Sequence, residues 1–270
     1  MKLRLSSTGL HSTWIYAPEF GFLLDAGEGV ATHLRDQLYS VSNIFLSHAH
    51  TDHIAGLPTL LYIRKRQSSL GPVRIYYPEN TPRIAELQAF IGELDRTEWI
   101  PIREGAEIQI GTKHIVRAFA TNHIHPDAPF GSLGYVFFER RTRLKAEYAG
   151  LPHEQVHALG SQGKQMSEPF LKSHFAYTGD TAPLSDETLI NLGEPDVLIH
   201  DATYLDEADL GTSRHSTLAH AQAAAATARA KRLVGFHLSI RYNDPEEPRI
   251  IPDGVQLVPP DGRYLDISTN

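Results

Sequence analysis

The stretch SHAHTDHIAG, residues 47–56, carries three histidines and one aspartate in the pattern H-x-H-x-D-H. The segment VSNIFLS that leads into it is apolar and β-prone, which predicts a strand that ends where the histidines begin. Alternate side chains of an extended backbone point the same way, so His48, His50 and Asp52 can converge on one side. His53 then joins them from the start of a helix. Imidazole and carboxylate groups together favour zinc, with manganese or iron as alternatives, so the stretch predicts a metal site rather than a histidine-rich surface loop.

Three later phrases extend this pattern in a fixed order. They are FATNHIHP (119–126), YTGDT (177–181) and GFHLSIRY (235–242). Together with the first motif they resemble the metallo-β-lactamase superfamily, and specifically its ribonuclease Z-like branch, which has a similar T-H-x-S-x-R-Y phrase at the last position. The agreement covers roughly residues 1–242. The resemblance implies a mixed α/β (α+β) chain folded as one four-layer αββα sandwich domain over residues 1–270.

The resemblance also implies two divalent metal ions, zinc in the first instance. It assigns one metal to His48, His50 and His123 and the other to Asp52, His53 and His237, with Asp180 as the bridge. Two dications held only by neutral imidazoles would repel each other, so an anionic bridge is required, and Gly179 before it permits a close backbone approach. Asp52 is further expected to accept a proton from the attacking water. The nearest alternative to His123 is His125.

A leaving-group acid is expected at His215, in the phrase SRHSTLAH. It precedes an alanine-rich helix for which Ser216 or Thr217 is the expected N-cap. Because a helix N-terminus disfavours the imidazolium form, a proton donor there needs a carboxylate partner, and Asp201 in LIHDATY is the candidate. The family carries glutamate at that place, so the shorter aspartate predicts a longer or rearranged hydrogen bond. The alternative for His215 is a helix-capping surface residue, a role that fits His220 better.

Three further residues receive roles from the same comparison. Asp25, in LDAGEG, resembles the family aspartate that orients a metal ligand without binding metal itself. Ser239 and Arg241 follow the last histidine, and the arginine is expected to hold a phosphate oxygen through a bidentate contact. A structural salt bridge is the alternative for Arg241.

Composition limits the remaining classes of protein. The chain has 270 residues, a formal charge of −7 and no cysteine, which excludes disulfides and thiolate ligands. The negative charge counts mildly against a large RNA footprint, because phosphate neutralisation dominates such binding. No apolar run reaches the length of a transmembrane helix, and the first residues lack an export signal, so we expect a cytoplasmic protein without a membrane partner.

Alternating hydrophobic patterns predict two αβ halves that face each other. Strands are expected at residues 3–5, 13–16, 20–24, 73–78, 98–102, 107–110, 114–120 and 134–139. Helices are expected at residues 30–38, 57–66, 81–93 and 219–232, the last with its basic end at the helix C-terminus. Residues 140–173 interrupt the pattern, and there the resemblance implies a short arm-like insertion that grips transfer RNA. Basic residues on it would form a basic face; the alternative is an ordinary solvated helix and loop.

The expected function is metal-dependent phosphodiester hydrolysis, with precursor tRNA and its 3′ trailer as the family substrate. The short arm, and the absence of a basic phrase in the loop STGLHSTWIY, leave hydrolysis of small phosphodiesters such as cyclic nucleotides as the alternative. A non-catalytic subunit is disfavoured because every ligand position is filled. An ester, thioester or lactam hydrolase is disfavoured by the paired HDAT and HST phrases. Family members commonly pair, so a homodimer is an expectation as well.

Overall fold

Two seven-stranded sheets run through the described part of the computed structural model, which covers residues 1–92, 96–123, 131–243 and 252–269. One sheet has the order β14 (Leu265–Ser268), β1 (Lys2–Thr8), β2 (Ser12–Ala17), β3 (Phe22–Leu24), β4 (Asn43–Phe45), β5 (Val73–Pro78) and β6 (Thr97–Ile102). The other has the order β13 (Val255–Leu257), β12 (Leu233–Phe236), β11 (Val197–Asp201), β10 (Ser167–Tyr177), β9 (Leu133–Leu144), β8 (His114–Ala120) and β7 (Glu107–Ile110).

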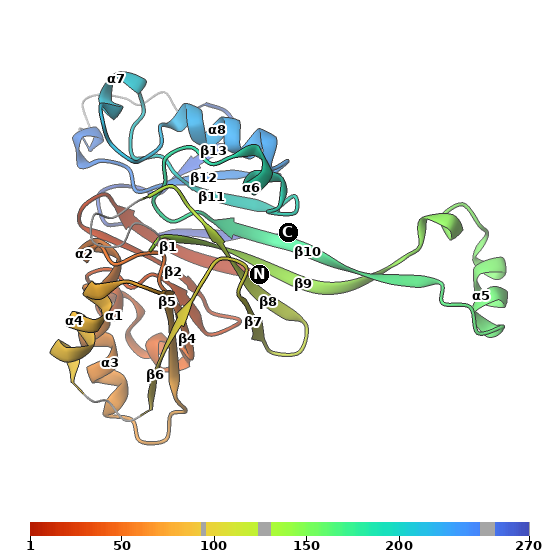
Figure 1. The fold of residues 1–270 in the computed structure, drawn as a ribbon, viewed down its shortest axis with the longest axis horizontal. Helices are drawn as coiled ribbons and strands as arrows, with labels where there is room; N and C mark the ends of the chain where they lie inside the picture. The colour runs from red at the N-terminus through yellow and green to blue at the C-terminus, as the bar shows by residue number, and fades with distance from the viewer. Residues whose placement is uncertain (93–95, 124–130, 244–251, 270) are drawn as a thin grey trace.

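Helices cover the outer face of each sheet (Figure 1). The first sheet carries α1 (Val30–Leu34), α2 (Thr51–Ile54), α3 (Leu57–Lys65) and α4 (Pro82–Ile91), with the 3₁₀ segment η1 (Arg35–Ser40). The second carries α6 (Asp186–Ile190) and α8 (Leu218–Thr227), with α7 (Glu207–Leu210) and η3 (Ile240–Tyr242) nearby. The remaining helical segments, η2 (Ala146–Tyr148) and α5 (His153–Ser161), lie between β9 and β10.

Three hydrophobic clusters separate the layers. The first joins the facing sides of the two sheets, with Phe22 and Phe45 from one sheet and Phe137 and Phe175 from the other. The second lies between the first sheet and α1, α3 and α4, and the third between the second sheet and α6 and α8. Strand alternation explains this division, because neighbouring residues of a strand such as β9 point to opposite faces. The predicted αββα sandwich is therefore confirmed.

The alanine-rich helix ends earlier than its composition predicted. Helix α8 stops at Thr227, and Arg229 adopts a left-handed backbone with φ 51°. The chain then turns so that Lys231 forms an ion pair with Asp196, with Nζ 2.7 Å from Oδ1. The expectation that the basic residues would close the helix C-terminus is wrong, because these residues belong to the following turn.

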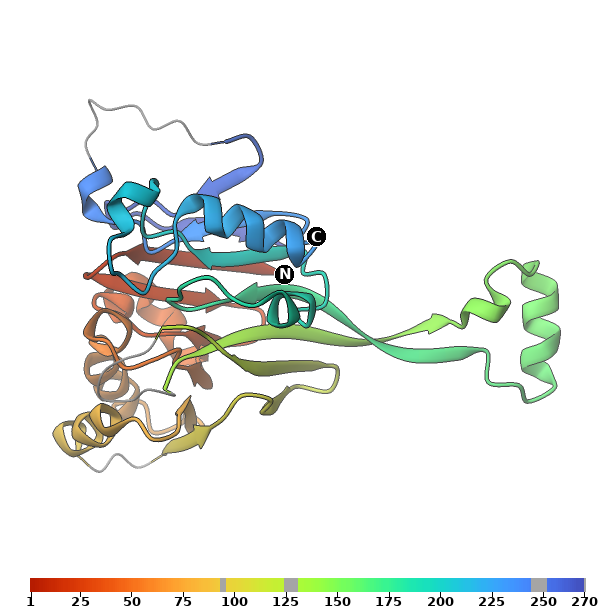
Figure 2. The same cartoon turned by 45° about the horizontal axis from the view of Figure 1, so that its top comes forward.

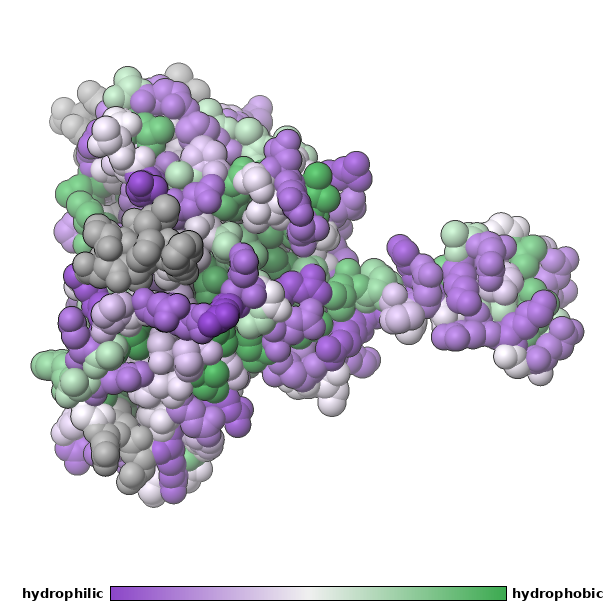
Figure 3. Space-filling model, viewed as in Figure 1, coloured by the Kyte–Doolittle hydropathy of each residue, from purple (hydrophilic) through white to green (hydrophobic). Residues whose placement is uncertain are grey.

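Strands β9 and β10 continue far beyond the body of the molecule. They form an antiparallel pair that extends from Tyr135 opposite Tyr177 to Leu144 opposite Ser167. Its register shifts once, between Ser173 and Phe175. Beyond the body they form an arm that carries η2 and α5 at its end (Figures 1 and 2). The sequence predicted a short insertion at about residues 140–173, and the expected shortness is wrong: β9 and β10 stay paired as far as Leu144 and Ser167 before η2 and α5 begin (Figure 1). The end of the arm is covered largely by hydrophilic residues (Figure 3).

The basic residues of the arm are partly neutralised. Arg141 forms an ion pair with Glu139, Arg143 with Glu168, and Lys172 with Asp196, with donor–acceptor distances of 2.6, 2.8 and 2.7 Å respectively. The expected basic face is therefore weaker than the number of arginines and lysines suggests.

Candidate metal centre and proton donor

The predicted ligands come from loops that follow strands of both sheets. His48, His50, Asp52 and His53 lie between β4 and the end of α2, as the sequence predicted. His123 follows β8, Asp180 follows β10, and His237 follows β12. The fold thus brings together residues up to 189 positions apart, from His48 to His237.

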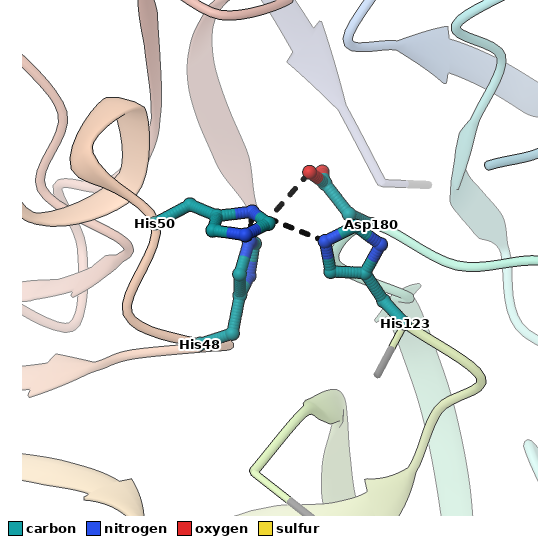
Figure 4. Close-up of side chains that lie close together, drawn as sticks. All are labelled: His48, His50, His123 and Asp180. Atoms are coloured by element: carbon teal, nitrogen blue, oxygen red, sulfur yellow. Dashed lines mark hydrogen bonds and ion pairs between the residues drawn. The ribbon is translucent and has the colours of Figure 1, made fainter. Parts of the chain in front are cut away.

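Four side chains form a first group of candidate ligands: His48, His50, His123 and Asp180 (Figure 4). The Nδ1 atom of His50 lies 2.9 Å from Nε2 of His48 and 3.1 Å from Nε2 of His123. Oδ2 of Asp180 lies 3.7 Å from Nε2 of His48. His48, His123 and Asp180 are buried and His50 is half-buried, so this group is enclosed on most sides. The alternative His125 lies outside the described residues.

Asp52, His53, Asp180 and His237 form a second group. Oδ2 of Asp180 lies 3.3 Å from Nε2 of His53 and 3.3 Å from Nε2 of His237. Oδ2 of Asp52 lies 3.1 Å from Nε2 of His237. A single oxygen of Asp180 therefore faces nitrogen atoms of both groups, which is the position that a bridging ligand needs.

The hydrogen bonds around the ligands determine which ring nitrogens face inward. Nδ1 of His53 lies 2.8 Å from Oδ2 of Asp25, and Nδ1 of His123 lies 3.1 Å from the carbonyl oxygen of Arg214. Both partners can only accept, so both Nδ1 atoms carry the hydrogen. With a metal bound, the rings of His53 and His123 would be neutral and would point their Nε2 lone pairs into the site.

The charge balance of the site fits metal cations. Lone pairs of neutral imidazoles facing the carboxylates of Asp52 and Asp180 would repel them, so positive charge is needed between them, as metal ions or as protons on the rings. Burial lowers the pKa of His53, but Asp180, Asp25 and Asp52 outweigh it and raise that pKa well above its usual range, so the site attracts cations. Oδ1 of Asp180 and Nε2 of His53 are moreover buried and have no hydrogen-bond partner among the described residues. Buried polar atoms without partners are costly. The donor set of imidazole nitrogens and carboxylate oxygens is the set that zinc and similar metals bind.

Both carboxylates of the site are ionised at neutral pH. Burial alone would raise the pKa of Asp180, but His237 and His53 outweigh it and hold that pKa well below its usual range. Burial likewise opposes the ionisation of Asp52, yet His53 and His237 lower its pKa to about 2. Ionised carboxylates are the form that ligates a cation.

Asp25 lies behind the ligands and is bonded to one of them, His53. The residue is fully buried, and its carboxylate accepts hydrogen bonds from Ser47 N, Ser47 Oγ, Tyr177 Oη and His53 Nδ1, at 2.7, 2.7, 2.6 and 2.8 Å. It contributes to neither candidate ligand group. Asp25 and His237 both have a left-handed backbone, with φ 55° and 63°. Non-glycine residues rarely adopt this conformation, and where they do it often accompanies a functional site.

The close approach that Gly179 permits is one between two loops, rather than the expected one between backbone and metal. It has φ +59°, and a Cβ atom there would lie 2.8 Å from the Cβ of Ser47. The glycine lets the loop that carries Asp180 pack against the loop that carries the histidine motif. The position therefore requires glycine for the contact between the two loops, in addition to the left-handed backbone.

His215 lies beside the ligand groups and is bonded to Asp201. Its ring stacks on that of His237, with centroids 5.0 Å apart, and its Nδ1 lies 2.8 Å from Oδ2 of Asp201. The expected lengthening of this bond is wrong: Asp201 is held close by Thr181 N and Thr203 N, at 3.0 and 2.9 Å. Burial disfavours the charged form of His215, but Asp201 outweighs it and raises the pKa of His215 to about 9.

The capping residues near His215 separate as predicted. Thr217 is the N-cap of α8, and it forms a capping box in which His220 is the reciprocal partner. Thr217 Oγ1 accepts from His220 N at 3.2 Å, and His220 Nδ1 accepts from Thr217 N at 3.2 Å. His220 therefore caps the helix, whereas His215 faces the ligand groups.

The two expected substrate contacts lie at the edge of this region. Ser239 is half-buried and precedes η3. Arg241 forms an ion pair with Asp209, with Nη1 2.9 Å from Oδ1, and its guanidinium lies over the ring of Tyr204. The salt bridge foreseen as an alternative is present, and the phosphate contact stays a prediction.

Sequence reasoning missed the hydroxyl groups behind the histidines. Ser47 Oγ lies 3.0 Å from Nδ1 of His48, and Thr203 Oγ1 lies 2.9 Å from Nδ1 of His237. Both residues stand inside quoted motifs, Ser47 before the first histidine and Thr203 in HDATY. Their position in the motifs was the available signal, but only the fold shows which histidine each one contacts.

Comparison with known proteins agrees with this geometry. The sequence model of the β-lactamase superfamily domain matches residues 21–150 and 166–238. The chain is 33% identical to a ribonuclease Z of Natronomonas pharaonis over 91% of this chain and 88% of that protein. It is 30% identical to a chloroplastic tRNase Z of Arabidopsis thaliana over 88% of this chain and 67% of that protein.

Solved structures show the same fold. The short form of human tRNase Z superimposes with a TM-score of 0.67, at 22% identity and with both chains fully covered. A diphosphatase of the PhnP family also superimposes with a TM-score of 0.67, at 18% identity over 99% of this chain and 98% of that one. Within the described residues, no helix combines the length and apolar character needed to cross a membrane.

Proposed function

The chain belongs to the β-lactamase superfamily and, within it, to the ribonuclease Z family, and we propose on this basis that it removes the 3′ trailer from precursor tRNA. It is a metal-dependent hydrolase. The observation that carries the proposal is the pairing of two adjoining ligand groups with a histidine–aspartate pair beside them. A phosphodiester requires both an activated water and a proton for its leaving alkoxide, and this site has candidates for both.

Two divalent ions, zinc in the first instance and manganese or iron as alternatives, are proposed to occupy the two groups. His48, His50 and His123 would hold one ion, Asp52, His53 and His237 the other, and Asp180 would bridge them. Bound there, the ions would polarise the phosphate and lower the pKa of a bound water. Asp25 would keep His53 in the orientation that ligation requires.

The proton transfers are assigned to Asp52 and His215. Asp52 is proposed to accept the proton of the attacking water. Its pKa of about 2 means that it is ionised and able to accept, but also that it is a weak base. It could therefore take a proton only from a water whose own pKa is lowered by the metals. His215 is proposed to donate a proton to the leaving oxygen. Asp201 supports this role, because its carboxylate keeps the imidazole protonated at neutral pH and leaves Nε2 to face the substrate.

The arm is proposed to hold the body of the tRNA. Helix α5 at the end of the arm and α2 in the metal loop lie at opposite ends of the molecule's long axis (Figures 1 and 2). An arm this far from its own metal centre can serve the site of a second chain, which supports a homodimer. Arg241 and Ser239 are proposed to contact the substrate near the metals.

Hydrolysis of a small phosphodiester is the second candidate. It is favoured by the turn between β1 and β2, next to His237, which presents Leu10, 85% exposed, and no arginine or lysine. Gly9 in this turn donates to the carbonyl oxygen of Leu238, so the turn lies beside the site. A small diester would need neither basic residues there nor an arm.

Cleavage mapping separates the two candidates. Zinc- or manganese-loaded protein is incubated with a precursor tRNA that carries a 3′ trailer, and in parallel with bis(p-nitrophenyl) phosphate. A single cut after the discriminator base, lost in Asp52→Ala, supports tRNA processing. An uncut precursor alongside rapid turnover of the small diester would reject tRNA processing and support the second candidate.

A further inference from the structure

Thr203 stands between a carboxylate and a candidate metal ligand. Its Oγ1 lies 2.7 Å from Oδ1 of Asp201 and 2.9 Å from Nδ1 of His237. All three side chains are buried. The backbone fixes this arrangement as well, because Ala202 N donates to Phe236 O and Ser239 N donates to Thr203 O, both at 3.0 Å.

The direction of these two hydrogen bonds follows from the chemistry of the groups. The ionised carboxylate of Asp201 can only accept, so the single hydroxyl hydrogen of Thr203 goes to Oδ1. Oγ1 can then only accept from the ring of His237, which must carry its hydrogen on Nδ1. The Nε2 lone pair of His237 is thereby turned toward Asp52 and Asp180, the other members of its ligand group.

A second hydroxyl group, that of Ser47, connects a buried aspartate to a candidate metal ligand in the same way. Ser47 Oγ donates to Oδ2 of Asp25 at 2.7 Å and lies 3.0 Å from Nδ1 of His48. Asp25 also bonds directly to His53, as Asp201 bonds directly to His215. Each buried aspartate therefore orients one histidine directly and a second through a hydroxyl group. A recurrence at two places argues against an incidental contact of Thr203.

We propose that Thr203 is a positioning residue that holds His237 in the ring orientation needed to bind metal, and so sets the affinity of the site formed by Asp52, His53, Asp180 and His237. The inference rests on the metal sites of the proposed function. One carboxylate, Asp201, then serves both the proton donor His215 and, through Thr203, a metal ligand. The other group, with His48, His50 and His123, does not depend on Thr203.

The test compares Thr203→Val, which removes the hydroxyl at nearly constant shape, with Thr203→Ser, which keeps it. Zinc affinity is measured for both sites by competition with a chromogenic chelator. Thr203→Val should weaken one of the two sites by roughly 10–100-fold, the usual effect of losing a partner of a ligating histidine. Thr203→Ser should bind both ions within a few-fold of the unchanged protein.

Thr269→Val is the matched control, because Thr269 is buried and its hydroxyl has no hydrogen-bond partner among the described residues. It should leave both affinities unchanged. Unchanged zinc binding in Thr203→Val would overturn the proposal, and so would an equal loss in Thr203→Ser, which would point to packing. The readout does not involve RNA, so a protein that passes this test but cuts no precursor refutes only the proposed substrate.

A spectroscopic measurement covers the case in which Thr203→Val does not fold. In zinc-loaded protein labelled with ¹⁵N at histidine, Nδ1 of His237 should carry a hydrogen that exchanges slowly with solvent. A bare Nδ1 at His237 would contradict the assignment directly, without any substitution.

Discussion

Nδ1 of His215 lies 2.8 Å from Oδ2 of Asp201, in a pair whose aspartate is fully buried while the histidine side chain keeps 17% of its surface exposed. Because the carboxylate of Asp201 is shielded from water, its negative charge is poorly screened and stabilises the protonated ring of His215. The exposed side of the ring remains available to a substrate. This arrangement is the one that a general acid needs, because the group must be both protonated and accessible.

Replacement of His215 by alanine should reduce phosphodiester turnover by roughly 10²–10⁴-fold, the scale of a lost general acid. Metal content should stay at the level of the unchanged protein, because His215 lies outside the two four-residue ligand groups. His215 also lies close to Asp201 and His237, but its Nδ1 is already bonded to Asp201. Turnover is measured on a diester whose leaving group is an alkoxide, either precursor tRNA or a cyclic nucleotide, because p-nitrophenolate leaves without help from an acid. Metal analysis of the same preparation checks the second expectation. His220→Ala is the control: His220 caps α8, so its loss should lower stability slightly and leave turnover in place. Lost metal or surviving activity in His215→Ala would show that its assigned role is wrong.

Replacement of Asp201 by asparagine should move the alkaline limb of the pH–rate profile to lower pH. The proton donor works only while protonated, and Asp201 raises the pKa of His215 to about 9 against the opposing effect of burial. Without the carboxylate charge, burial dominates and the ring loses its proton at lower pH. The pH profile of kcat for a diester with an alkoxide leaving group, either precursor tRNA or a cyclic nucleotide, measures the shift. As a control, Asp196→Asn, at the base of the arm, should leave the alkaline limb where it is. If Asp201→Asn also left it unmoved, Asp201 would not be the residue that keeps the proton donor protonated.

Much of the site could be predicted because its chemistry is concentrated in short motifs. A motif such as residues 47–56 shows which side chains could bind metal, and the alternation of side chains along an extended segment predicts that these side chains converge. The partners of the ligands are a different matter. The bond between Thr203 and His237 joins the end of one strand to the end of its neighbour, and no local pattern specifies which hydroxyl meets which ring.

The arm shows a second limit of the sequence. Its strands β9 and β10 lack an apolar face outside the body, since little covers them there, so the hydrophobic period that marks a strand fades after Glu139. Pairing between the two strands maintains them instead. The early end of α8 was missed for a related reason: the left-handed backbone of Arg229 and the contact of Lys231 with Asp196 belong to the tertiary fold, which the helix propensity of the alanine run does not describe.

Replacement of Asp180 by alanine should lower metal occupancy itself. One oxygen of this residue faces both ligand groups, so its removal leaves two dications without the anion between them. Metal analysis after exhaustive dialysis should find fewer than two ions per chain, together with lost turnover. Asp186→Ala, in the first turn of α6 and exposed, should retain the full complement. Two tightly held ions in Asp180→Ala would refute the bridging assignment.

Removal of the arm should separate the large substrate from the small one. Leu144 and Ser167 are paired across the hairpin, so an Asn-Gly turn can replace residues 145–166 without disturbing the strands below. Cleavage of precursor tRNA should lose about tenfold or more in kcat/KM, the effect of about 1.4 kcal/mol of lost contact. Turnover of bis(p-nitrophenyl) phosphate should not change, because both ligand groups lie in the body. Equal loss with both substrates would indicate a damaged fold, whereas full activity on precursor tRNA would show that the arm does not hold the RNA.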